Sequence, residues 1–379
     1  MKCKLSDICS FRRGKISVDR LNTNNYISTE NMLPNKGGIT EASSLPTVPL
    51  TQEYRKGDVL VSNIRPYFKK IWKAKYDGGC SNDVLVFAAN SNTDKDFLYY
   101  ILANDEFFAY SMATSKGTKM PRGDKTSIMQ YEVPVMDIEL QRRISSILKS
   151  IDEKIELNNA INNNLEQQAQ AIFANEFLSL QSLPDGWKQA SLIDIADYLN
   201  GLAMQKHRPS ANEIGIPVLK IKELRQGCCD DNSELCSPSI KSDYIIHDGD
   251  VIFSWSGSLL VDFWCGGFCG LNQHLFKVSS IKYDKWFYYA WTKHHLDRFI
   301  AVAADKATTM GHIKRDELAK AEVLIPNEAD YKRIGALLQP IYDLIISNRI
   351  ENKKLAETRD SLLPKLMSGE IDMSEVDYE

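Results

Sequence analysis

Apolar positions in the middle of the chain recur with a spacing of four, then three, residues. This alternation continues from residue 144 to residue 172, and it is the heptad pattern that keeps one face of a helix against a partner helix. The seam positions are Ile144, Leu148, Ile151, Ile155, Asn158, Asn162, Leu165, Ala169 and Ile172. The pattern predicts a long helix from about Glu139 to Leu180.

The same seam returns 190 residues later. Its positions are Ile334, Leu338, Ile341, Ile345, Asn348, Asn352, Leu355, Arg359 and Leu362. Both copies have Asn at two seam positions, and a seam Asn lowers stability but penalises any register in which it faces an apolar side chain. We therefore expect the two helices to pair with each other; alternatively, each packs on a separate core. A helix of about 36 residues is roughly 54 Å long, which suits a spacer.

Two expectations follow from burial of the seam. Replacing Asn158 and Asn348 by Leu should raise the melting temperature and loosen the helix register. Inserting four residues near Asn164 should lengthen the spacer by about one helical turn, roughly 6 Å.

The rest of the chain is duplicated as well. The repeated motifs are Tyr99-Tyr100 and Tyr288-Tyr289, Lys116-x-Thr118-x-Met120 and Lys306-x-Thr308-x-Met310, and Arg143-Ile144 and Arg333-Ile334. Their offset is half of the 379 residues, so the chain is two copies of one unit, each ending in a long helix.

Each unit begins with a globular part in which short apolar runs follow turn residues. Gly57-Asp58 precedes one such run, and Gly249-Asp250 precedes its copy. These runs indicate strands of a mixed sheet. Residues 24–48 and 208–241 hardly align, which predicts a shared framework with different loops.

These patterns predict five segments. We expect globular parts at residues 1–135 and 183–327, long helices at residues 136–182 and 328–368, and a flexible acidic tail at residues 369–379.

Pro340 lies inside the second predicted helix. Its ring should remove a backbone hydrogen bond and kink the helix there.

Composition narrows the class of protein. No apolar run reaches the roughly 20 residues of a membrane span, and the N-terminus lacks the apolar core of a signal peptide. The eight Cys are scattered without a Cys-x-x-Cys pair, which favours reduced thiols in the cytoplasm over a metal cluster. The net charge of −4 argues against nucleic acid, but residues 55–75 carry seven basic side chains and one acidic one. That run is either a phosphate-binding surface or a solvated face.

The chain lacks the motifs of the common catalytic sites. It contains no phosphate-binding Gly-x-x-x-x-Gly-Lys-Ser/Thr loop, no Gly-x-Ser-x-Gly turn and no (Asp/Asn)-Pro-Pro-aromatic run of amino-methyltransferases. Its six His have no metal-ligand spacing. We therefore expect a non-catalytic protein without metal.

Two loops suit nucleic-acid recognition. Residues 63–70 follow a predicted strand and combine an amide, a guanidinium, an aromatic ring and two amines. Arg and Asn bind guanine and adenine through paired hydrogen bonds, and Lys binds phosphate. Residues 116–123 form a basic loop after a helix, and its copy at residues 306–315 is also basic. The counterpart of the first loop, residues 254–258, is neutral and small, so it should recognise something different.

A polar triplet, Asn272-Gln273-His274, precedes a predicted strand of the second unit. It suits either base recognition or the capping of a turn. The candidate DNA-contacting residues are Asn63, Arg65, Tyr67, Lys69, Lys70, Lys116, Thr118, Lys119, Arg122, Asn272, Gln273, Lys306, Thr308, His312 and Lys314.

Several motifs resemble one known family, the specificity (S) subunits of type I restriction-modification systems. The resemblance covers nearly the whole chain and is most specific in the helical segment at residues 134–177. The motifs are Glu139-Leu140-Gln141-Arg142-Arg143-Ile144, Asp152-Glu153-Lys154-Ile155-Glu156-Leu157-Asn158, Leu183-Pro184-x-Gly186-Trp187-Lys188, Gly249-Asp250-Val251-Ile252-Phe253-Ser254-Trp255-Ser256-Gly257 and Asn272-Gln273-His274-Leu275-Phe276. Two features depart from the family pattern. One is the short N-terminal lead before Leu5, and the other is Pro340 in the second long helix.

The resemblance implies an α+β fold with two pseudo-twofold-related mixed α/β target-recognition domains. Two long helices, forming an antiparallel coiled coil, would separate them. Each domain would recognise one half of a bipartite double-stranded DNA target, and the helices would set the spacer and dock two methyltransferase (M) subunits. Restriction (R) subunits would join the full complex. The chain itself would hold no cofactor, because S-adenosylmethionine and ATP belong to these partners.

Two other functions stay open at this stage. The chain could be a coiled-coil scaffold that binds proteins and not DNA, or an enzyme with an unrecognised site. DNA binding together with a methylation partner distinguishes the first, and turnover without partners distinguishes the second.

Overall fold

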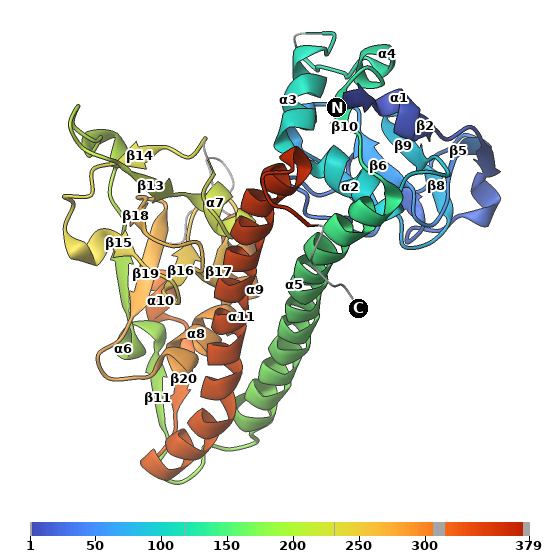
Figure 1. Ribbon diagram of the computed structural model, residues 1–379. Coiled ribbons are helices and arrows are strands. Elements are labelled where there is room, and N and C mark those ends of the chain that lie inside the picture. Colours follow the sequence, from blue (N-terminus) through green and yellow to red (C-terminus); the bar gives the residue numbers. More distant parts are fainter. Residues whose placement is uncertain (1, 118, 231, 306–314, 374–379) are drawn as a thin grey trace. The chain divides into compact units, whose positions relative to one another are not determined.

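The chain divides into two compact units. The computed structural model describes residues 2–117, 119–230, 232–305 and 315–373. Unit 1 consists of residues 1–153 and 355–379, and unit 2 consists of residues 154–354 (Figure 1). Each unit therefore combines one globular part with segments of both long helices.

The globular part of unit 1 is built on two four-stranded sheets. The first has the order β2-β9-β6-β7 and is antiparallel throughout; the second has the order β3-β5-β8-β4, with β4 parallel to β8; β1 and β10 form a separate pair. The strands are β1 (Lys2–Lys4), β2 (Cys9–Phe11), β3 (Lys15–Ser17), β4 (Tyr26–Ile27), β5 (Leu50–Tyr54), β6 (Val59–Ser62), β7 (Ile71–Lys73), β8 (Gly78–Cys80), β9 (Val84–Ala89) and β10 (Glu132–Pro134). The helices are α1 (Leu5–Ile8), η1 (Val18–Arg20), η2 (Pro66–Phe68), α2 (Lys95–Ala103), α3 (Asp105–Ala113) and α4 (Lys125–Ile128).

Unit 2 repeats this framework. Its sheets have the orders β12-β19-β16-β17 and β14-β13-β18-β15, and β11 pairs with β20. The strands are β11 (Lys188–Ser191), β12 (Asp197–Asn200), β13 (Ile216–Leu219), β14 (Leu235–Cys236), β15 (Ile245–Ile246), β16 (Val251–Ser254), β17 (Leu260–Phe263), β18 (Cys269–Leu271), β19 (Leu275–Ser279) and β20 (Glu322–Ile325). The helices are α6 (Leu192–Ile195), η4 (Met204–Lys206), α7 (Ile221–Gln226), η5 (Ser242–Tyr244), α8 (Lys285–His294), α9 (Leu296–Asp305) and α10 (Arg315–Ala319).

The two globular parts have a similar arrangement of strands but differ in an edge strand and in the segments that connect the strands. In each second sheet the central strand, β8 or β18, has one parallel and one antiparallel neighbour. The edge strand differs, because β3 joins beside β5 in unit 1, whereas β14 joins beside β13 in unit 2. The stretch between β4 and β5 has no helix, whereas the stretch between β13 and β15 contains α7. The prediction of a shared framework with different connections is confirmed.

The packing also repeats. In unit 1, α2 lies across β6, β7 and β9, and in unit 2, α8 lies across β17 and β19 (Figure 1). The turns before β6 and β16 both place a Gly in the left-handed region, with φ of 91° at Gly57 and 85° at Gly249. Glycine adopts this conformation without the steric penalty of a Cβ atom. The Gly-Asp motif before β6 and before β16 therefore has the same structural cause in both copies, which is the need for a left-handed residue in the turn.

Both predicted long helices are present. They are α5 (Ile138–Phe173) and α11 (Glu328–Ser368). The first ends earlier than Leu180, because a five-residue π-helical turn, η3 (Ala174–Leu178), follows Phe173. The second continues through Pro340; the kink expected there stays a prediction.

All of the predicted seam residues are buried or partly buried. In unit 1, Ile144 and Leu148 of α5 share a core with Leu363 of α11, and in unit 2, Ile334 and Leu338 of α11 share a core with Phe173 of α5 and with the sheet. The seam ends therefore belong to the globular cores, as the separate-core alternative held. The centre of the seam, in contrast, joins the two helices to each other.

The Asn residues of that centre make direct hydrogen bonds within unit 2. Asn158 Nδ2 donates to Asn352 Oδ1 at 2.8 Å, and Asn348 Nδ2 donates to Asn162 Oδ1 at 2.9 Å. The earlier Asn of α5 thus meets the later Asn of α11, so the helices run antiparallel. The pairs join non-equivalent positions of the two repeats, because Asn158 corresponds to Asn348 and Asn162 to Asn352.

Because Asn158 and Asn348 belong to different pairs, replacing both by Leu is now expected to lower the stability and not to raise it. Those replacements remove one partner from each pair and leave Asn162, which is 5% exposed, without its partner side chain. We now expect a loss of about 1–3 kcal/mol. Asn162→Leu with Asn348→Leu removes one whole pair and should leave stability unchanged or raise it by about 1 kcal/mol. Urea unfolding of both double variants tests this; equal stability of the two would contradict the observed pairing.

The expected loose tail begins later than predicted. Met373 is 3% exposed, and with Ile371 it packs in the core of unit 1. Arg143 Nη1 of α5 donates to the Met373 carbonyl oxygen at 3.1 Å. The acidic composition of this segment hid two apolar side chains that the core accepts. The expectation of a flexible tail was wrong for residues 371–373, and residues 374–379 lie outside the described part of the chain.

Candidate nucleic-acid interface

The two loops that the sequence singled out in the first unit lie against each other. Ile64 pairs with Arg122 in a β-bridge, and the Arg65 amide donates to the Pro121 carbonyl at 2.8 Å. The Gly123 amide donates to the Asn63 carbonyl at 3.2 Å. Residues 63–70, 116–117 and 119–123 therefore form one surface, which we call the basic loop surface.

Strand β6 positions this surface. The chain leaves β6 at Ser62, whose hydroxyl donates to the Ile64 carbonyl at 3.1 Å and fixes the turn. The second loop is closed by reciprocal backbone bonds between Lys116 and Arg122. A Cβ atom at Gly123 would lie 2.8 Å from Asn63 Oδ1, so the close approach of the two loops requires glycine there.

A third segment, residues 33–38, completes the surface, and sequence analysis missed it. The Asn35 amide donates to the Phe68 carbonyl at 2.8 Å, and the Lys36 amide donates to the Lys69 carbonyl at 2.9 Å. The motif Pro34-Asn-Lys-Gly-Gly38 has the composition of a turn and carries a cation, which was the available signal. Nothing in the sequence showed that it lies beside residues 66–69.

An ion-pair cluster fixes the backbone of two of these segments. Lys36 Nζ lies 3.1 Å and Lys69 Nζ 2.8 Å from the carboxylate of Asp105, at the start of α3. Partial burial raises the pKa of Asp105, but the two lysines outweigh it and hold the pKa below its usual value. Lys36 also lies 3.7 Å from Asp360 of α11. Lys69 thus lies on the basic loop surface, but its charge is partly neutralised.

The remaining predicted cations vary in their freedom. Lys70 Nζ donates to the Thr29 carbonyl at 2.6 Å, and burial lowers the pKa of this amine. Lys116 pairs with Asp124 at 2.6 Å, which holds the pKa of that carboxyl at about 2. Arg122 lies 3.3 Å from Asp83 but is half exposed, and Lys119 is exposed. Lys119 and Arg122 are therefore the predicted cations best placed for phosphate.

Two predicted side chains turn partly inward. Asn63 Oδ1 and Arg65 Nε are buried, and neither has a hydrogen-bond partner among the described residues. An unsatisfied buried polar atom costs about 1–3 kcal/mol, and such atoms concentrate where a ligand or strain accounts for them. The Asn63 amide oxygen does not face the surface, so contact of this oxygen with a base would require the loop to rearrange.

The counterpart in unit 2 is neutral and closed. Ser254 Oγ donates to the Ser256 and Ser258 carbonyls, at 3.3 and 2.8 Å, so the turn after β16 matches the turn after β6. Ser256 Oγ and His274 Nδ1 are 3.1 Å apart, and Gln273 is partly exposed beside them. Asn272 is 5% exposed, and its Oδ1 accepts the His274 amide, so Asn272 caps the turn.

Five predicted residues lie outside the described part of the chain. They are Thr118, Lys306, Thr308, His312 and Lys314. For the basic loop copy at residues 306–314, the structure therefore gives no geometry, and its role stays a prediction.

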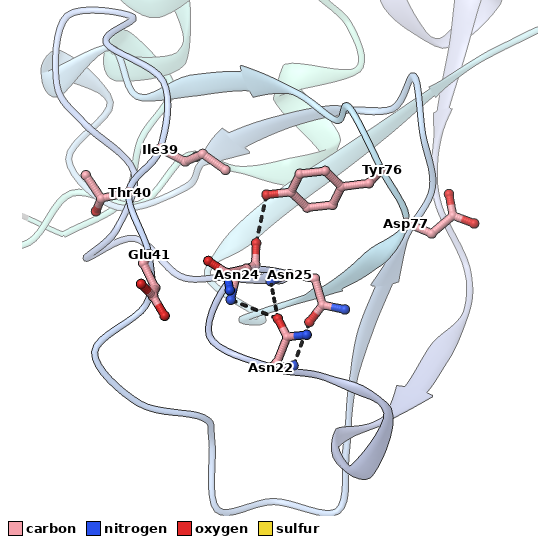
Figure 2. A pocket seen from close by; sticks show the side chains of 8 residues that line it. All are labelled: Asn22, Asn24, Asn25, Ile39, Thr40, Glu41, Tyr76 and Asp77. Atoms are coloured by element: carbon pink, nitrogen blue, oxygen red, sulfur yellow. Dashed lines mark hydrogen bonds between the residues drawn. The ribbon is translucent and has the colours of Figure 1, made fainter. Parts of the chain in front are cut away.

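A polar depression of about 520 Å³ lies elsewhere in unit 1, and Figure 2 shows its lining. Tyr76 donates to the Asn24 carbonyl at 2.7 Å, and Asn22 accepts the Asn24 amide at 2.9 Å. Its charged lining residues are Glu41 and Asp77, with no cation. Phosphate would be repelled there, which favours the basic loop surface as the DNA-contacting region.

The described residues contain neither a metal-binding cluster nor a membrane-spanning helix. No group of three or more His, Cys, Asp or Glu side chains could hold a metal ion there. Nor does any helix in that part have the length and apolar content to cross a membrane.

Comparison with known proteins identifies the family. The profile described as "Type I restriction modification DNA specificity domain" matches residues 1–167 and again residues 184–357. The chain therefore belongs to the type I restriction-modification DNA specificity family. It is a DNA-recognition component and not a catalytic one, as the sequence predicted.

Individual relatives agree with this assignment. The chain is 26% identical over 306 residues to the type I restriction enzyme MjaIX specificity subunit of Methanocaldococcus jannaschii, covering 74% of this chain and 70% of that protein. It is 22% identical over 433 aligned positions to the HindI specificity subunit of Haemophilus influenzae, covering 91% and 94%. The crystal structure of a type I restriction-modification S subunit from M. genitalium has a TM-score of 0.57 at 14% identity, covering 97% of this chain and 96% of that one, and confirms the fold.

Lys119 and Arg122, the predicted cations best placed for phosphate, should account for part of the electrostatic binding of DNA. We expect Lys119→Ala with Arg122→Ala to weaken DNA binding about tenfold at moderate salt and to reduce the slope of log K against log salt by about 1–2. The control is Lys56→Ala, an exposed Lys beyond the opposite end of β6. Salt titrations of fluorescence anisotropy measure both. An unchanged slope in the double variant would place the phosphate contacts elsewhere.

Proposed function

We propose that this chain recognises a two-part DNA sequence, one half with each globular part. The observation that carries the proposal is the pair of turns after β6 and β16. Both are fixed by the same serine hydrogen bond, to Ile64 in one and Ser256 in the other. Yet the first leads into a basic, aromatic loop and the second into a neutral, hydroxyl-rich one. One framework carrying two chemically different surfaces suits the recognition of two different half-sites.

The long helices would set the distance between these half-sites and dock the other subunits. Antiparallel pairing through Asn158–Asn352 and Asn162–Asn348 fixes the register of α5 against α11. Two methyltransferase (M) subunits would bind S-adenosylmethionine and methylate adenine, and restriction (R) subunits would use ATP. The chain would thus need no cofactor of its own and would act in the cytoplasm with its DNA.

The test joins genome mapping to direct binding. The chain is co-expressed with an amino-methyltransferase encoded beside its gene, and methylated adenines are mapped to give the target. We expect a motif of two defined halves around an undefined gap. Base changes in either half should weaken binding of the purified complex by about 1–3 kcal/mol per base pair. Binding that responds to salt but not to sequence would overturn the proposal.

A further inference from the structure

The backbone of the basic loop surface is locally strained. Among the described residues, the non-glycine residues with positive φ are Asn35 (53°), Lys36 (60°), Arg65 (51°) and Lys69 (49°). All four lie in the two segments of unit 1 that hydrogen-bond to each other. Left-handed backbone at residues other than glycine costs of the order of 1 kcal/mol each, and such residues cluster where function needs a fixed geometry.

A set of backbone hydrogen bonds holds this strained turn rigidly. The Phe68 and Lys69 amides donate to the Arg65 and Pro66 carbonyls, both at 2.9 Å, and form the single turn η2. Asn35 and Lys36 close it from one side, and Pro121 accepts the Arg65 amide from the other. The position of the turn is therefore fixed before any ligand arrives.

The strained turn presents two aromatic rings to solvent. Tyr67 is 49% and Phe68 37% exposed, and their ring centroids are 4.6 Å apart. Pro66 is buried beneath them, and Lys70 Nζ lies 5.8 Å from the Phe68 ring. Leu33, 37% exposed, belongs to the adjoining segment. Exposing neighbouring apolar rings at the tip of a rigid, strained turn has no benefit for folding, which indicates a ligand.

The charges around the rings indicate the ligand. Lys36, Arg65, Lys69, Lys119 and Arg122 belong to the segments that carry or adjoin the turn. Cationic segments next to exposed aromatic side chains suit a polyanion with flat apolar faces, which is nucleic acid. Minor-groove-binding proteins that combine these features frequently insert an apolar side chain between base pairs and partly unstack them.

The corresponding turn of unit 2 lacks such a tip. Trp255 is turned down onto Phe276, with ring centroids 5.5 Å apart and an interplanar angle of 29°. Its Nε1 donates to Asn200 Oδ1 at 3.0 Å. The aromatic residue of this turn is thus engaged within its own unit.

We propose that Tyr67 and Phe68 form a wedge that enters the stack of the DNA half-site bound by unit 1 and unstacks one base step. This inference rests on the proposed function. A pyrimidine–purine step is the expected position, since such steps unstack most easily. The half-site bound by unit 2 receives no such wedge, so the two halves of one target are recognised in physically different ways.

The test uses the full chain with its methylation partner and duplexes carrying the mapped target. Permanganate oxidises unstacked thymines, and 2-aminopurine fluoresces when unstacked. Besides the target adenines, which the methylation partner itself flips out of the stack, we expect for the wild type one further hyperreactive step, confined to one half-site. Tyr67→Ala with Phe68→Ala should remove that reactivity and weaken binding about 10–100-fold, from stacking worth about 1–3 kcal/mol per ring. The control Phe268→Ala removes an exposed ring of unit 2, 66% exposed, and should change neither.

The outcomes separate this inference from the proposed function. Sequence-specific binding by the wild type without any unstacked step other than the target adenines overturns the wedge and leaves the proposed function standing. Reactivity that persists in the double alanine variant also overturns the wedge. A wild-type complex that shows no sequence-specific binding overturns both. Since both rings are exposed, the melting temperature of the variant should match the wild type, which verifies that it folds.

Discussion

Replacing Arg359 by Ala should destabilise unit 1 by about 3 kcal/mol. Arg359 Nη1 lies 2.6 Å from Asp152 Oδ1, and the two side chains are only 16% and 22% exposed. Removing one member of a buried ion pair leaves an uncompensated charge, which costs about 3–5 kcal/mol when burial is complete. The Tyr100 hydroxyl donates to Asp152 at 2.8 Å, and burial raises the pKa of Tyr100, so this donor stays neutral and cannot replace the guanidinium.

Unit 2 supplies the matched rescue. At the positions equivalent to Asp152 and Arg359 it has Tyr342 and Ala169, both buried in an apolar cluster. Asp152→Tyr with Arg359→Ala should therefore recover most of the stability, because no charge stays buried. Arg333→Ala is the control, since its pair with Glu176 is half exposed on the Arg side and should contribute less than about 1 kcal/mol.

Urea unfolding of Arg359→Ala, Asp152→Tyr and the double variant, followed in the full chain, completes a double-mutant cycle, with Arg333→Ala as the control. The cycle assigns the coupling energy to Asp152 and Arg359 directly. A loss below about 1 kcal/mol for Arg359→Ala would show that the pair is screened by water. A double variant as unstable as the sum of its single variants would show that the two side chains act independently.

Lengthening both helices by seven residues should shift the DNA target by about three base pairs. Seven residues add about 10 Å of helix, and B-DNA rises about 3.4 Å per base pair. Seven is one heptad and keeps the seam aligned. An insertion of four residues would instead rotate the seam by about 40° around the helix axis. The earlier choice near Asn164 is also unsuitable, because the adjacent Glu166 pairs with Arg349 at 2.8 Å.

The structure indicates where the extra heptads belong. One follows Glu153 in α5 and the other follows Ala356 in α11. At these points the Asp152–Arg359 pair of unit 1 and the Asn158–Asn352 pair of unit 2 both stay intact. The control carries the heptad in α5 alone, which shifts α5 against α11 and should lower the melting temperature.

The measurement is the mapped methylation motif of cells that express each variant. We expect both half-sites to be retained and the undefined gap to grow by about three base pairs, with loss of methylation at the original sites. Methylation at the original gap would show that the helices do not set the spacing.

The helices were predictable because their signal is local and periodic. A seam of nine positions at heptad spacing identifies the buried face of α5 without any tertiary information. Its Asn residues showed that polar groups must meet, but not which ones. The repeat relates Asn158 to Asn348, whereas antiparallel pairing joins Asn158 to Asn352. The pairing in space, and not the repeat in the sequence, decides which double variant removes a complete hydrogen-bonded pair.

The candidate interface was predictable only in part, for a related reason. Residue type marked the loops at residues 63–70 and 116–123 as suited to DNA. Their association depends on backbone bonds between distant residues, such as Arg65 to Pro121, which composition does not encode. The loop at residues 33–38 was missed because its role follows from its position beside Phe68. Asn63 was chosen for its amide, but the oxygen of that amide points inward.

The most direct test of the account is an exchange of residues 1–135 for the corresponding domain of another specificity subunit. The boundary lies just before α5, so both helices and their Asn pairs are kept. Methylated adenines in the host genome give the resulting target. We expect one half of the motif to change to that of the donor, while the gap and the other half stay as they were. Exchange of residues 183–327 should alter only the opposite half. A chimera in which both halves change, or neither does, would contradict the assignment of one half-site to each globular part.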